Sequence, residues 1–352
     1  MVLTRHAGPE ELAALARDLH AAVAAPVTIS GYQLAVTASI GAVDAPAGDA
    51  TTPADLIRAA DITLQQAKAE GRGRVVFHDP DRDAAQLTLY TLAATLPGAL
   101  DRGEFSLVYQ PLVRLADERL HGVEALLRWR HPRFGTLGPD HFIALAEQTG
   151  AILPLGRWIL TEACRAAAAH RDDLPDLLLS VNIAIRQLQH PGLVEDVTRA
   201  LADSGLPPER LQLEVTEHAV MSADPDGPPA ALRKLVELGV RIAIDDFGTG
   251  YSNLAYLRRL PVHDLKIAGV FLDRLRDPDQ ADPADLHLVS TLVHLAHGLD
   301  LTVTAEAVET AAQARYLREL GADTAQGWHY GRPTALAEIA RTAAGGAVSG
   351  AP

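Results

Sequence analysis

The sequence has very little sulfur, few aromatic residues and no long apolar run. One cysteine and two methionines occur in 352 residues, which excludes a disulfide framework and a zinc site of paired cysteines. Cys164 lies in an alanine-rich helical segment, where a buried core thiol is expected. No run of about 18 apolar residues exists, and the N-terminus lacks the apolar core of a signal peptide. We therefore expect a cytoplasmic protein without a membrane span.

Positive charge is also scarce. Lys and Arg total 31 against 45 Asp and Glu, which gives a formal net charge of -14. Such a field repels nucleic acid and anionic membranes, so neither is an expected partner, and a small anionic ligand would need local positive charge. Hydrophobic residues make up 48% and charged residues 22% of the chain, which is typical of globular proteins. The length allows roughly two domains at ~100–200 residues each.

The segment RIAIDDFGTGYSNL, from Arg241 to Leu254, presents the strongest single pattern. Its apolar start predicts a strand buried on both faces, as in a parallel sheet covered by helices. Asp245 and Asp246 follow at the C-terminal end of this strand, which is the edge where α/β proteins place their chemistry. The glycines after them predict a tight turn. Ser252 or Asn253 would cap the next helix.

Further apolar, β-branched runs each carry one polar residue near their end. These residues are Glu124, Asn182, Glu214, Lys266 and Glu306. Segments of helical period separate the runs, such as Leu155 to His170 and Leu286 to Leu299. Alternation of strand and helix is typical of a β/α barrel, in which the strand ends meet at one mouth. Because unpaired buried carboxylates would be very costly, we expect this mouth to hold a cation.

Residues 1 to about 80 are predicted to form a separate mixed α/β unit. Its expected elements are a strand at Met1 to Thr4, a helix at Pro9 to Ala24, a strand pair around Thr28 to Val43, a helix at Pro53 to about Glu70 and the strand VVF. A polar link at Asp79 to Asp83 and a connecting helix at Ala84 to Leu96 follow. We divide the chain into residues 1–80, a linker with its helix at 81–100, and a barrel domain at 101–345.

The barrel domain begins with the strand FSLVYQPLV, turns through RLADERL and returns in LHGVEALLRW. Parallel strands need a crossover of a dozen or more residues, and this connection is too short. The first strand is therefore expected to be antiparallel to the second.

The acid and amide side chains expected at the barrel mouth are all oxygen donors. They are Glu124, Asn182, Glu214, Asp245, Asp246 and Glu306. No HExxH or paired-cysteine motif competes, so Mg²⁺, Mn²⁺ or Ca²⁺ is favoured over zinc. Such a set suffices for two cations with one bridging carboxylate, an arrangement that suits phosphoester hydrolysis. Lys266 would add positive charge, and Arg128 is either a fork for phosphate or a surface ion-pair partner.

The segment EALLRW at Glu124 to Trp129 resembles the signature of the EAL domain of cyclic di-GMP phosphodiesterases. The resemblance covers about Leu87 to Ala340, with many motifs in the family's order. The other motifs are YQP at Tyr109, VNIAIRQL at Val181, LEVTE at Leu213, DDFGTGYSNL at Asp245, LKI at Leu265, TAEAVET at Thr304 and QGWHYGRP at Gln326. It implies an α/β fold, a TIM-like (β/α)8 barrel with an antiparallel first strand, and a signalling hydrolase that converts cyclic di-GMP to linear pGpG.

The resemblance also implies a role for each site residue. One metal ion would be held by Glu124, Asn182, Glu214 and Asp245, and the second by Asp245, Asp246 and Glu306. Lys266 would help to polarise the attacking water, while the substrate or its water network would be contacted by Gln110, Arg128 and Gln326. The catalytic set of Lys266, Glu306 and Asp246 would be completed by Glu217, which anchors the DFGTG loop, and by Glu309 behind the site. Mg²⁺ or Mn²⁺ is the expected cofactor, Ca²⁺ is expected to inhibit, and a homodimer through the barrel is an allowed assembly.

The N-terminal unit resembles the C-terminal part of a GGDEF domain, the diguanylate cyclase fold. The resemblance rests on VTASIGA at Val36 to Ala42 and on LIRAADITLQQAKAEGRGRVVF at Leu56 to Phe77. The GGDEF signature and everything before it are absent, and Gln65 replaces the usual Tyr. Because the nucleotide loop is missing, cyclase activity is not expected, and the shortened sheet would expose an edge.

Some positions depart from the EAL pattern. Ala184 stands where the family has Ser, Ala307 where it has Gly, and Trp328 with His329 where it has an aromatic–aliphatic pair; we expect these changes to be tolerated. Ala268 replaces the Asp of the family's K-I-D run. Side chains two apart on a strand share a face, so residue 268 should point with Lys266 toward the barrel mouth. The missing acid predicts a slow enzyme that binds substrate normally.

Two other functions fit parts of the pattern. A catalytically degenerate EAL module would act as a cyclic di-GMP receptor or a protein-interaction domain, which Ala268 and the shortened N-terminal unit favour. A metal-free barrel enzyme would use Lys266 as a Schiff-base nucleophile, although the surrounding acids would hold its ammonium charged. A kinase motif at Asp246 to Gly248 is excluded, since no glycine-rich loop accompanies it.

Overall fold

The computed structural model describes residues 8–44, 52–223, 230–250 and 254–344. The chain divides into two compact units, residues 1–94 and residues 95–352, and each is described by itself. The predicted strand at Met1 to Thr4 and the proposed caps Ser252 and Asn253 lie outside the described residues. Within those residues, no helix is both long enough and apolar enough to cross a membrane.

The N-terminal unit combines helices with two short strand pairs. Its elements are α1 (Pro9–Ala24), β1 (Val27–Ile29), β2 (Tyr32–Leu34), β3 (Ile40–Ala42), α2 (Pro53–Ala69), β4 (Val75–Phe77) and most of α3 (Pro80–Thr95). β1 and β2 form an antiparallel hairpin, and β3 pairs in parallel with β4. Gly41 lets α2 approach β3 closely, because a Cβ at this position would lie 2.5 Å from the backbone nitrogen of Leu64. In the described part of the chain, the sheet of β3 and β4 has no third strand, so neither of these strands pairs on its outer edge.

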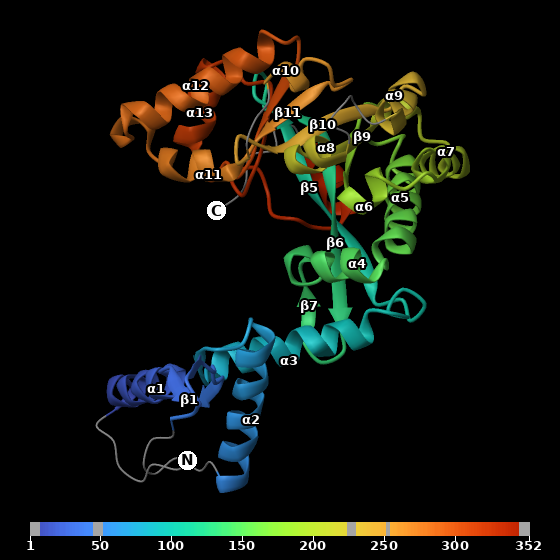
Figure 1. Cartoon of the computed structure of the whole chain (residues 1–352). Coiled ribbons are helices and arrows are strands. Elements are labelled where there is room, and N and C mark those ends of the chain that lie inside the picture. The colour runs from blue at the N-terminus through green and yellow to red at the C-terminus, as the bar shows by residue number, and fades with distance from the viewer. Residues whose placement is uncertain (1–7, 45–51, 224–229, 251–253, 345–352) are drawn as a thin grey trace. The chain divides into compact units, whose positions relative to one another are not determined.

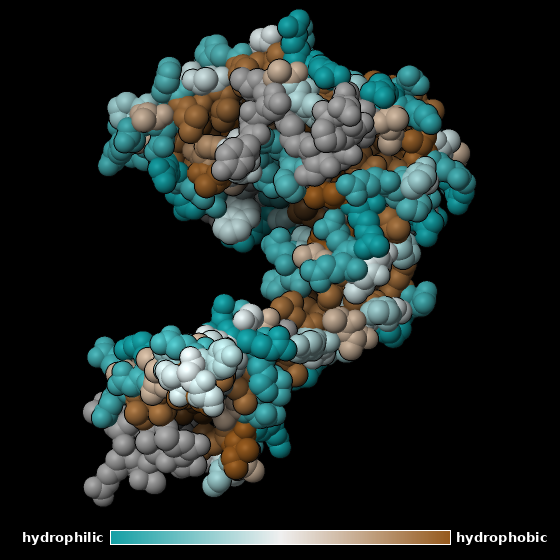
Figure 2. Space-filling view, viewed as in Figure 1, coloured by the Kyte–Doolittle hydropathy of each residue, from teal (hydrophilic) through white to brown (hydrophobic). Residues whose placement is uncertain are grey.

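Apolar side chains remain at the surface of this unit. The exposed ones in the hairpin region are Val27, Ile29, Tyr32, Leu34 and Val36, and Figure 2 shows hydrophobic residues on the face of the unit in view. A two-stranded sheet offers too little surface to cover them.

One boundary expectation is wrong. The residues predicted as a polar link, Asp79 to Asp83, mostly belong to α3, which begins at Pro80. Proline is compatible with the first turn of a helix because the first N–H groups have no intrahelical partner there. Polar composition alone therefore did not mark a loop.

The second unit is a closed barrel (Figure 1). Its strands are β5 (Phe105–Arg114), β6 (Leu120–His131), β8 (Leu178–Ile183), β9 (Leu211–Thr216), β10 (Arg241–Phe247), β11 (Asp264–Ile267), β12 (Thr302–Ala305) and β13 (Thr324–Gln326). β5 pairs antiparallel with both β6 and β13 and so closes the ring, whereas the other neighbours are parallel. The reversed first strand agrees with the short connection that the sequence places after it. A further strand, β7 (Gly135–Leu137), extends β6 as a hairpin.

Helices follow the strands and surround the barrel. The longer ones are α5 (Ile152–Ala169), α7 (Leu193–Ser204), α9 (Ala230–Glu237), α12 (Pro283–His297), α13 (Ala311–Glu319) and α14 (Leu336–Ala343). The shorter ones are α4 (Ile143–Thr149), α6 (Ile185–Leu188), α8 (Glu217–Ala223), α10 (Leu254–Leu257) and α11 (Gly269–Leu272). Single 3₁₀ turns occur at Pro139–His141, Pro208–Arg210, Asp273–Leu275 and Pro278–Gln280. The segments Leu155 to His170 and Leu286 to Leu299 were predicted as helical, and they lie within α5 and α12 except for their last one or two residues.

The main hydrophobic core lies between the barrel and its helices. In β9, Leu211, Leu213 and Val215 belong to this core, while the alternate residues Gln212 and Glu214 are equally buried. Because strand side chains alternate between faces, the polar pair points into the barrel. The interior of the barrel is therefore polar, and its outer surface provides the apolar packing.

Candidate active site

Neighbouring strands bring the predicted site residues to matching heights in the barrel. Glu124 of β6 pairs in register with Gln110 of β5, and Asn182 of β8 pairs with Glu214 of β9. Glu306 directly follows β12, and its backbone N–H donates to the carbonyl of Ile267 in β11 at 3.2 Å. Residues far apart in the sequence therefore meet at one end of the barrel.

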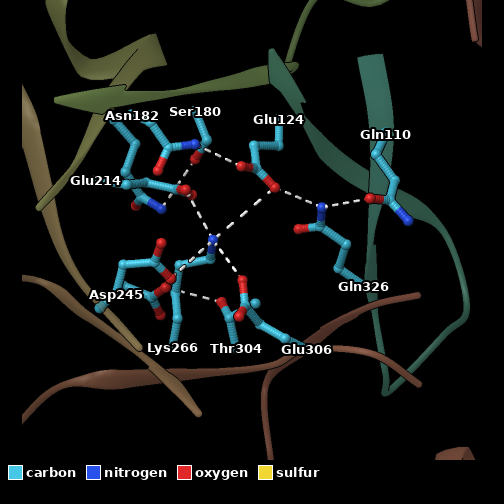
Figure 3. A network of polar contacts seen from close by, with 12 residues as sticks. Gln110, Glu124, Ser180, Asn182, Glu214, Asp245, Lys266, Thr304, Glu306 and Gln326 are labelled. Atoms are coloured by element: carbon cyan, nitrogen blue, oxygen red, sulfur yellow. Dashed lines mark hydrogen bonds and ion pairs between the residues drawn. The ribbon is translucent and has the colours of Figure 1, made fainter. Parts of the chain in front are cut away.

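The Lys266 ammonium lies at the centre of this end (Figure 3). Its Nζ is 2.6 Å from Glu306, 2.7 Å from Glu214, 3.2 Å from Asp245 and 3.9 Å from Glu124. The side chain is fully buried, with 0% of its surface exposed. A buried lysine is stable only when acids surround it in this way.

These acids fix the protonation state of Lys266. Burial by itself would lower the pKa of the amine, but Asp245, Glu124, Glu214 and Glu306 together hold its pKa well above the usual value. A lysine with a raised pKa is a poor nucleophile, because the amine must lose its proton to react. The Schiff-base alternative is therefore disfavoured.

Burial raises the pKa of the two acids nearest to Lys266, whereas it acts to lower the pKa of the lysine itself. Burial raises the pKa of Glu214 well above its usual range, against the stabilising charge of Lys266. Burial likewise raises the pKa of Glu306 to about 7, again opposed by Lys266 and reinforced by Asp245. The single positive charge of Lys266 therefore does not balance the negative charges of the acids around it.

Glu124 connects the network to both sides of the barrel. One carboxylate oxygen accepts a hydrogen bond from Asn182 Nδ2 at 2.6 Å, and the other accepts one from Gln326 Nε2 at 2.6 Å. Gln326 also donates to Gln110 Oε1 at 3.0 Å (Figure 3). Both carboxylate oxygens of Glu124 are therefore fixed in position by amide groups.

Asp246 lies at the rim of this network. Its side chain is exposed, and its φ of 53° places it in the left-handed region at a bulge in β10. Burial of part of the side chain and the negative charge of Asp245 raise its pKa. A left-handed conformation is unfavourable for residues other than glycine and commonly marks a functional position.

Glu217 and Glu309 make the supporting contacts. Glu217, the first residue of α8, is buried and accepts a hydrogen bond from the backbone N–H of Gly248 at 3.1 Å. It thus holds the DFGTG turn, which is the contact that the sequence predicts. Glu309 lies in the loop before α13 and forms an ion pair with Arg276 at 2.7 Å.

A pocket of about 310 Å³ opens beside the network. Its lining includes Gln110, Glu124, Glu306, Gln326 and Trp328. The structure therefore brings two of the three predicted substrate contacts to the pocket.

Arg128 is not among the residues that line this pocket. It lies farther along β6, where its guanidinium donates to the carbonyl of Leu127 at 2.8 Å. In the described part of the chain it forms no ion pair with a carboxylate. Its charge is consequently free for an anion, and the surface ion pair considered as an alternative is not present among the described residues.

Two departures from the family pattern have structural consequences. The strand β11 ends at Ile267, and Ala268 is the N-cap residue of α11, so the two-residue alternation of the strand does not extend to residue 268. Alanine has no side-chain oxygen with which to cap a helix. Ala307 has a φ of 53°, in the left-handed region that glycine adopts freely. Alanine there costs about 1 kcal/mol relative to glycine.

A second polar layer lies deeper in the barrel and was not predicted from the sequence. It consists of Ser180, Gln212, Asp264 and Thr304, each two residues before a predicted site residue. Two-residue alternation along each strand was the signal that could have identified them. The contact between Trp328, which is 55% exposed, and the Arg332 guanidinium, 4.2 Å from the indole ring centroid, was not predicted either.

The donor set fits a hard divalent cation. Among the described residues, no three His, Cys, Asp or Glu side chains converge as metal ligands would, because Lys266 lies between the acids. However, Glu214 Oε1 is buried without a hydrogen-bond partner in the described part of the chain, and Asp245 Oδ1 faces only the Lys266 ammonium at 3.2 Å. Carboxylate and amide oxygens are the ligands that Mg²⁺ and Mn²⁺ prefer. The chemistry of the site and its deficit of positive charge therefore suit such an ion.

This arrangement matches a known family. Residues 93–333 match the family model described as "EAL domain", and residues 1–74 match "Diguanylate cyclase, GGDEF domain". The chain belongs to the EAL-domain family. Its EAL domain is a TIM-like barrel preceded by a short GGDEF-family region, as the sequence predicts.

Several relatives of this EAL-domain protein carry functional names. MucR of Pseudomonas aeruginosa, a bifunctional diguanylate cyclase/cyclic di-GMP phosphodiesterase, is 40% identical over 92% of this chain and 47% of its own length. NbdA of the same organism, a cyclic di-GMP phosphodiesterase, is 39% identical over 89% of this chain and 40% of its own length. This chain thus spans less than half the length of either relative. The solved structure of PaMucR phosphodiesterase in complex with c-di-GMP has a TM-score of 0.67 and 43% identity, covering 71% of this chain and 99% of that one.

Proposed function

We propose that the protein is a phosphodiesterase that hydrolyses cyclic di-GMP to linear pGpG and depends on Mg²⁺ or Mn²⁺. The observation that carries the proposal is the buried Lys266 ammonium among Glu124, Glu214, Asp245 and Glu306. This cluster supports the proposal because it brings a positive ammonium and several negative carboxylates together at the barrel mouth, as phosphoester chemistry requires. The relatives named as cyclic di-GMP phosphodiesterases share this domain.

Two ions would complete the site. We assign one to Glu124, Asn182, Glu214 and Asp245, and the second to Asp245, Asp246 and Glu306. When bound, such ions stabilise the developing charge on the phosphoryl group and make a bound water more acidic. The proposal includes a cytoplasmic location, since the only cysteine is buried and the fold needs no disulfide.

The chain's own residues then bind and orient the reactants. Hydrolysis forms a bond from the water oxygen to phosphorus and breaks the bond from phosphorus to the 3′ oxygen, which takes up a proton. Lys266 keeps its proton and stabilises negative charge beside the attacked phosphate. Gln326 and Gln110 form part of the pocket wall, and Arg128 supplies a fork for a phosphate.

Removal of divalent cations should abolish turnover. Treatment with excess EDTA should reduce cyclic di-GMP hydrolysis to background, and Mg²⁺ or Mn²⁺ should restore it. Ca²⁺ should not restore it and should inhibit in competition with Mg²⁺, because the larger ion binds with looser geometry and misplaces the water. Product formation is measured by chromatography after each addition. Turnover that persists after thorough chelation would contradict the proposal.

Residues 1–79 should be dispensable for the chemistry. A chain that starts at Pro80 keeps α3, whose Leu92 is buried, and the whole barrel unit. We expect its kcat on cyclic di-GMP to stay within about threefold of the full-length value, since the site residues all lie beyond residue 100. Circular dichroism serves as the folding control. A shortened chain that folds but has no activity would show that the N-terminal unit organises the site.

We propose that Ala268 slows this enzyme. An aspartate at this N-cap would accept hydrogen bonds from the first N–H groups of α11 and add a carboxylate near Ala307, whose Cβ would lie 2.6 Å from a Cβ built on Gly269. Ala268→Asp should therefore raise kcat roughly tenfold while changing the Kd for substrate much less. Ala268→Asn is the matched control, because it caps the helix without charge. An Asp variant with an unchanged or lower single-turnover rate would remove Ala268 as the cause.

A further inference from the structure

A second cavity, which we name the basal cavity, lies at the opposite end of the barrel. Its volume is about 540 Å³. Its lining includes the first residues of five parallel strands, namely Leu178, Arg241, Asp264, Thr302 and Thr324. The catalytic acids lie nearer the other ends of these strands, so the basal cavity is separate from the pocket beside Glu124 and Glu306.

Arginines gather in the basal cavity, in a protein that carries net negative charge. Arg114 pairs with Asp117 at 2.9 Å, Arg318 pairs with Glu118 at 3.1 Å, and Arg210 pairs with Asp176. Arg241 differs from the other three. Its Nε is buried without a hydrogen-bond partner, and the guanidinium forms no ion pair within the described residues.

None of the acids that line the basal cavity forms an ion pair with Arg241 in the described part of the chain, although the positive charge of Arg241 acts against the burial that raises the pKa of Asp264. Asp264 accepts hydrogen bonds from the hydroxyls of Thr302 at 2.6 Å and Thr304 at 2.8 Å. Asp323 accepts from the Val303 backbone N–H at 2.8 Å and lies 3.0 Å from His297. Asp176 is paired with Arg210, and Glu209 is exposed to solvent.

The positive charge of Arg241 acts on two nearby histidines. Burial, followed by the positive charges of Arg114, Arg241 and Arg210, lowers the pKa of His121. Burial and the charge of Arg241 also lower the pKa of His263. Both shifts favour the neutral imidazole, and Arg241 is the one arginine of the cavity lining without an ion pair among the described residues.

A buried acceptor lies beside this cation. Gln212 pairs in register with Arg241 across β9 and β10, and its side chain is only 1% exposed. Its Nε2 donates to Ser180 Oγ at 3.1 Å, which leaves Oε1 buried without a donor in the described part of the chain. A buried amide oxygen of this kind normally accepts a hydrogen bond.

We propose that the basal cavity binds a hydroxyl-bearing phosphate monoester of the size of a sugar phosphate or a nucleoside monophosphate. The phosphate oxygens would pair with the guanidinium fork of Arg241, and a hydroxyl of the ligand would donate to Gln212 Oε1. The volume lies in the range typical of small-molecule sites, and Leu112 and Leu178 supply apolar wall. The site is independent of the phosphodiesterase activity proposed above.

Ribose 5-phosphate, inorganic phosphate and ribose are suitable probes for calorimetric titration of the full chain in EDTA. We expect ribose 5-phosphate to bind at least tenfold more tightly than inorganic phosphate, and ribose to show no binding. Arg241→Gln should weaken ribose 5-phosphate at least tenfold, because one charge-assisted contact is lost. Arg165→Gln, which changes an exposed arginine of α5, should leave binding unchanged.

Glu124→Ala tests the separation of the two sites and should leave ribose 5-phosphate binding unchanged. If Arg241→Gln does not fold, Arg241→Lys replaces it, with an expected loss of at least threefold from the missing fork. An Arg241 variant that binds as well as wild type would overturn the proposal. So would loss of binding in Glu124→Ala, or the absence of binding in the wild-type chain.

Discussion

Glu124→Ala should reduce kcat on cyclic di-GMP by about 1,000-fold or more. Glu124 accepts hydrogen bonds from Asn182 and Gln326 and faces the Lys266 ammonium at 3.9 Å. Its loss removes one proposed metal ligand and leaves two amide groups without their acceptor. Metal affinity, measured by calorimetry with Mn²⁺, should fall along with turnover.

Two further variants make this prediction specific. Glu162→Ala, at a half-buried glutamate of α5 that pairs with Arg165, should leave kcat and metal affinity unchanged. Arg128→Ala should raise the Kd for substrate about tenfold or more with a smaller effect on kcat, because it removes a phosphate contact that is uniform in the ground and transition states. Normal turnover in Glu124→Ala would show that the metal assignment is wrong.

Lys266→Met should have an equally large effect on turnover and a second effect on stability. Removing the ammonium leaves Glu214, Glu306 and Asp245 without their buried counter-charge. Breaking a buried ion pair in this way typically destabilises a protein by about 3–5 kcal/mol. We therefore expect the free energy of unfolding to fall by several kcal/mol in EDTA, measured by urea titration.

Divalent cations test whether the loss of stability in Lys266→Met comes from the uncompensated charge of the acids. Mg²⁺ or Mn²⁺ should restore much of the stability of Lys266→Met, because an ion bound to the native acids stabilises the folded state. It should not restore turnover. Lys234→Met, at an exposed position of α9, is the control for loss of a lysine. A Lys266→Met variant as stable as wild type without metal would contradict the view that the ammonium compensates these acids.

Strand ends and their spacing made much of this site predictable. A buried strand can be recognised from runs such as IAI before Asp245, and parallel strands bring their ends together whatever the sequence separation. The positions of Glu214, Lys266 and Glu306 followed from that rule alone. The reversal of β5 followed from a connection too short for a crossover.

Other features depend on tertiary geometry that a sequence pattern does not contain. The central place of Lys266 depends on how four strands converge around one ammonium. The left-handed conformation of Asp246 depends on a bulge between β10 and β11. The end of β11 before Ala268 depends on α11 starting at Gly269, which two-residue alternation could not reveal.

The basal cavity was hidden for a similar reason. Arg241 opens the strand RIAIDDF and looks from the sequence like an ordinary solvated start of a strand. Only the packing of the neighbouring strands shows that its Nε is buried and that no acid of the described residues pairs with it. Burial without a partner is a property of the folded chain.

Product analysis is the most direct test of the central claim. Purified full-length protein is incubated with cyclic di-GMP and Mg²⁺ or Mn²⁺, and the nucleotides are separated by chromatography, with Glu124→Ala as the blank. We expect cyclic di-GMP to disappear and linear pGpG to appear in equal amount with wild type and not with Glu124→Ala. Cyclic di-GMP that stays intact while bound to a stoichiometric amount of metal-loaded wild-type protein would contradict it.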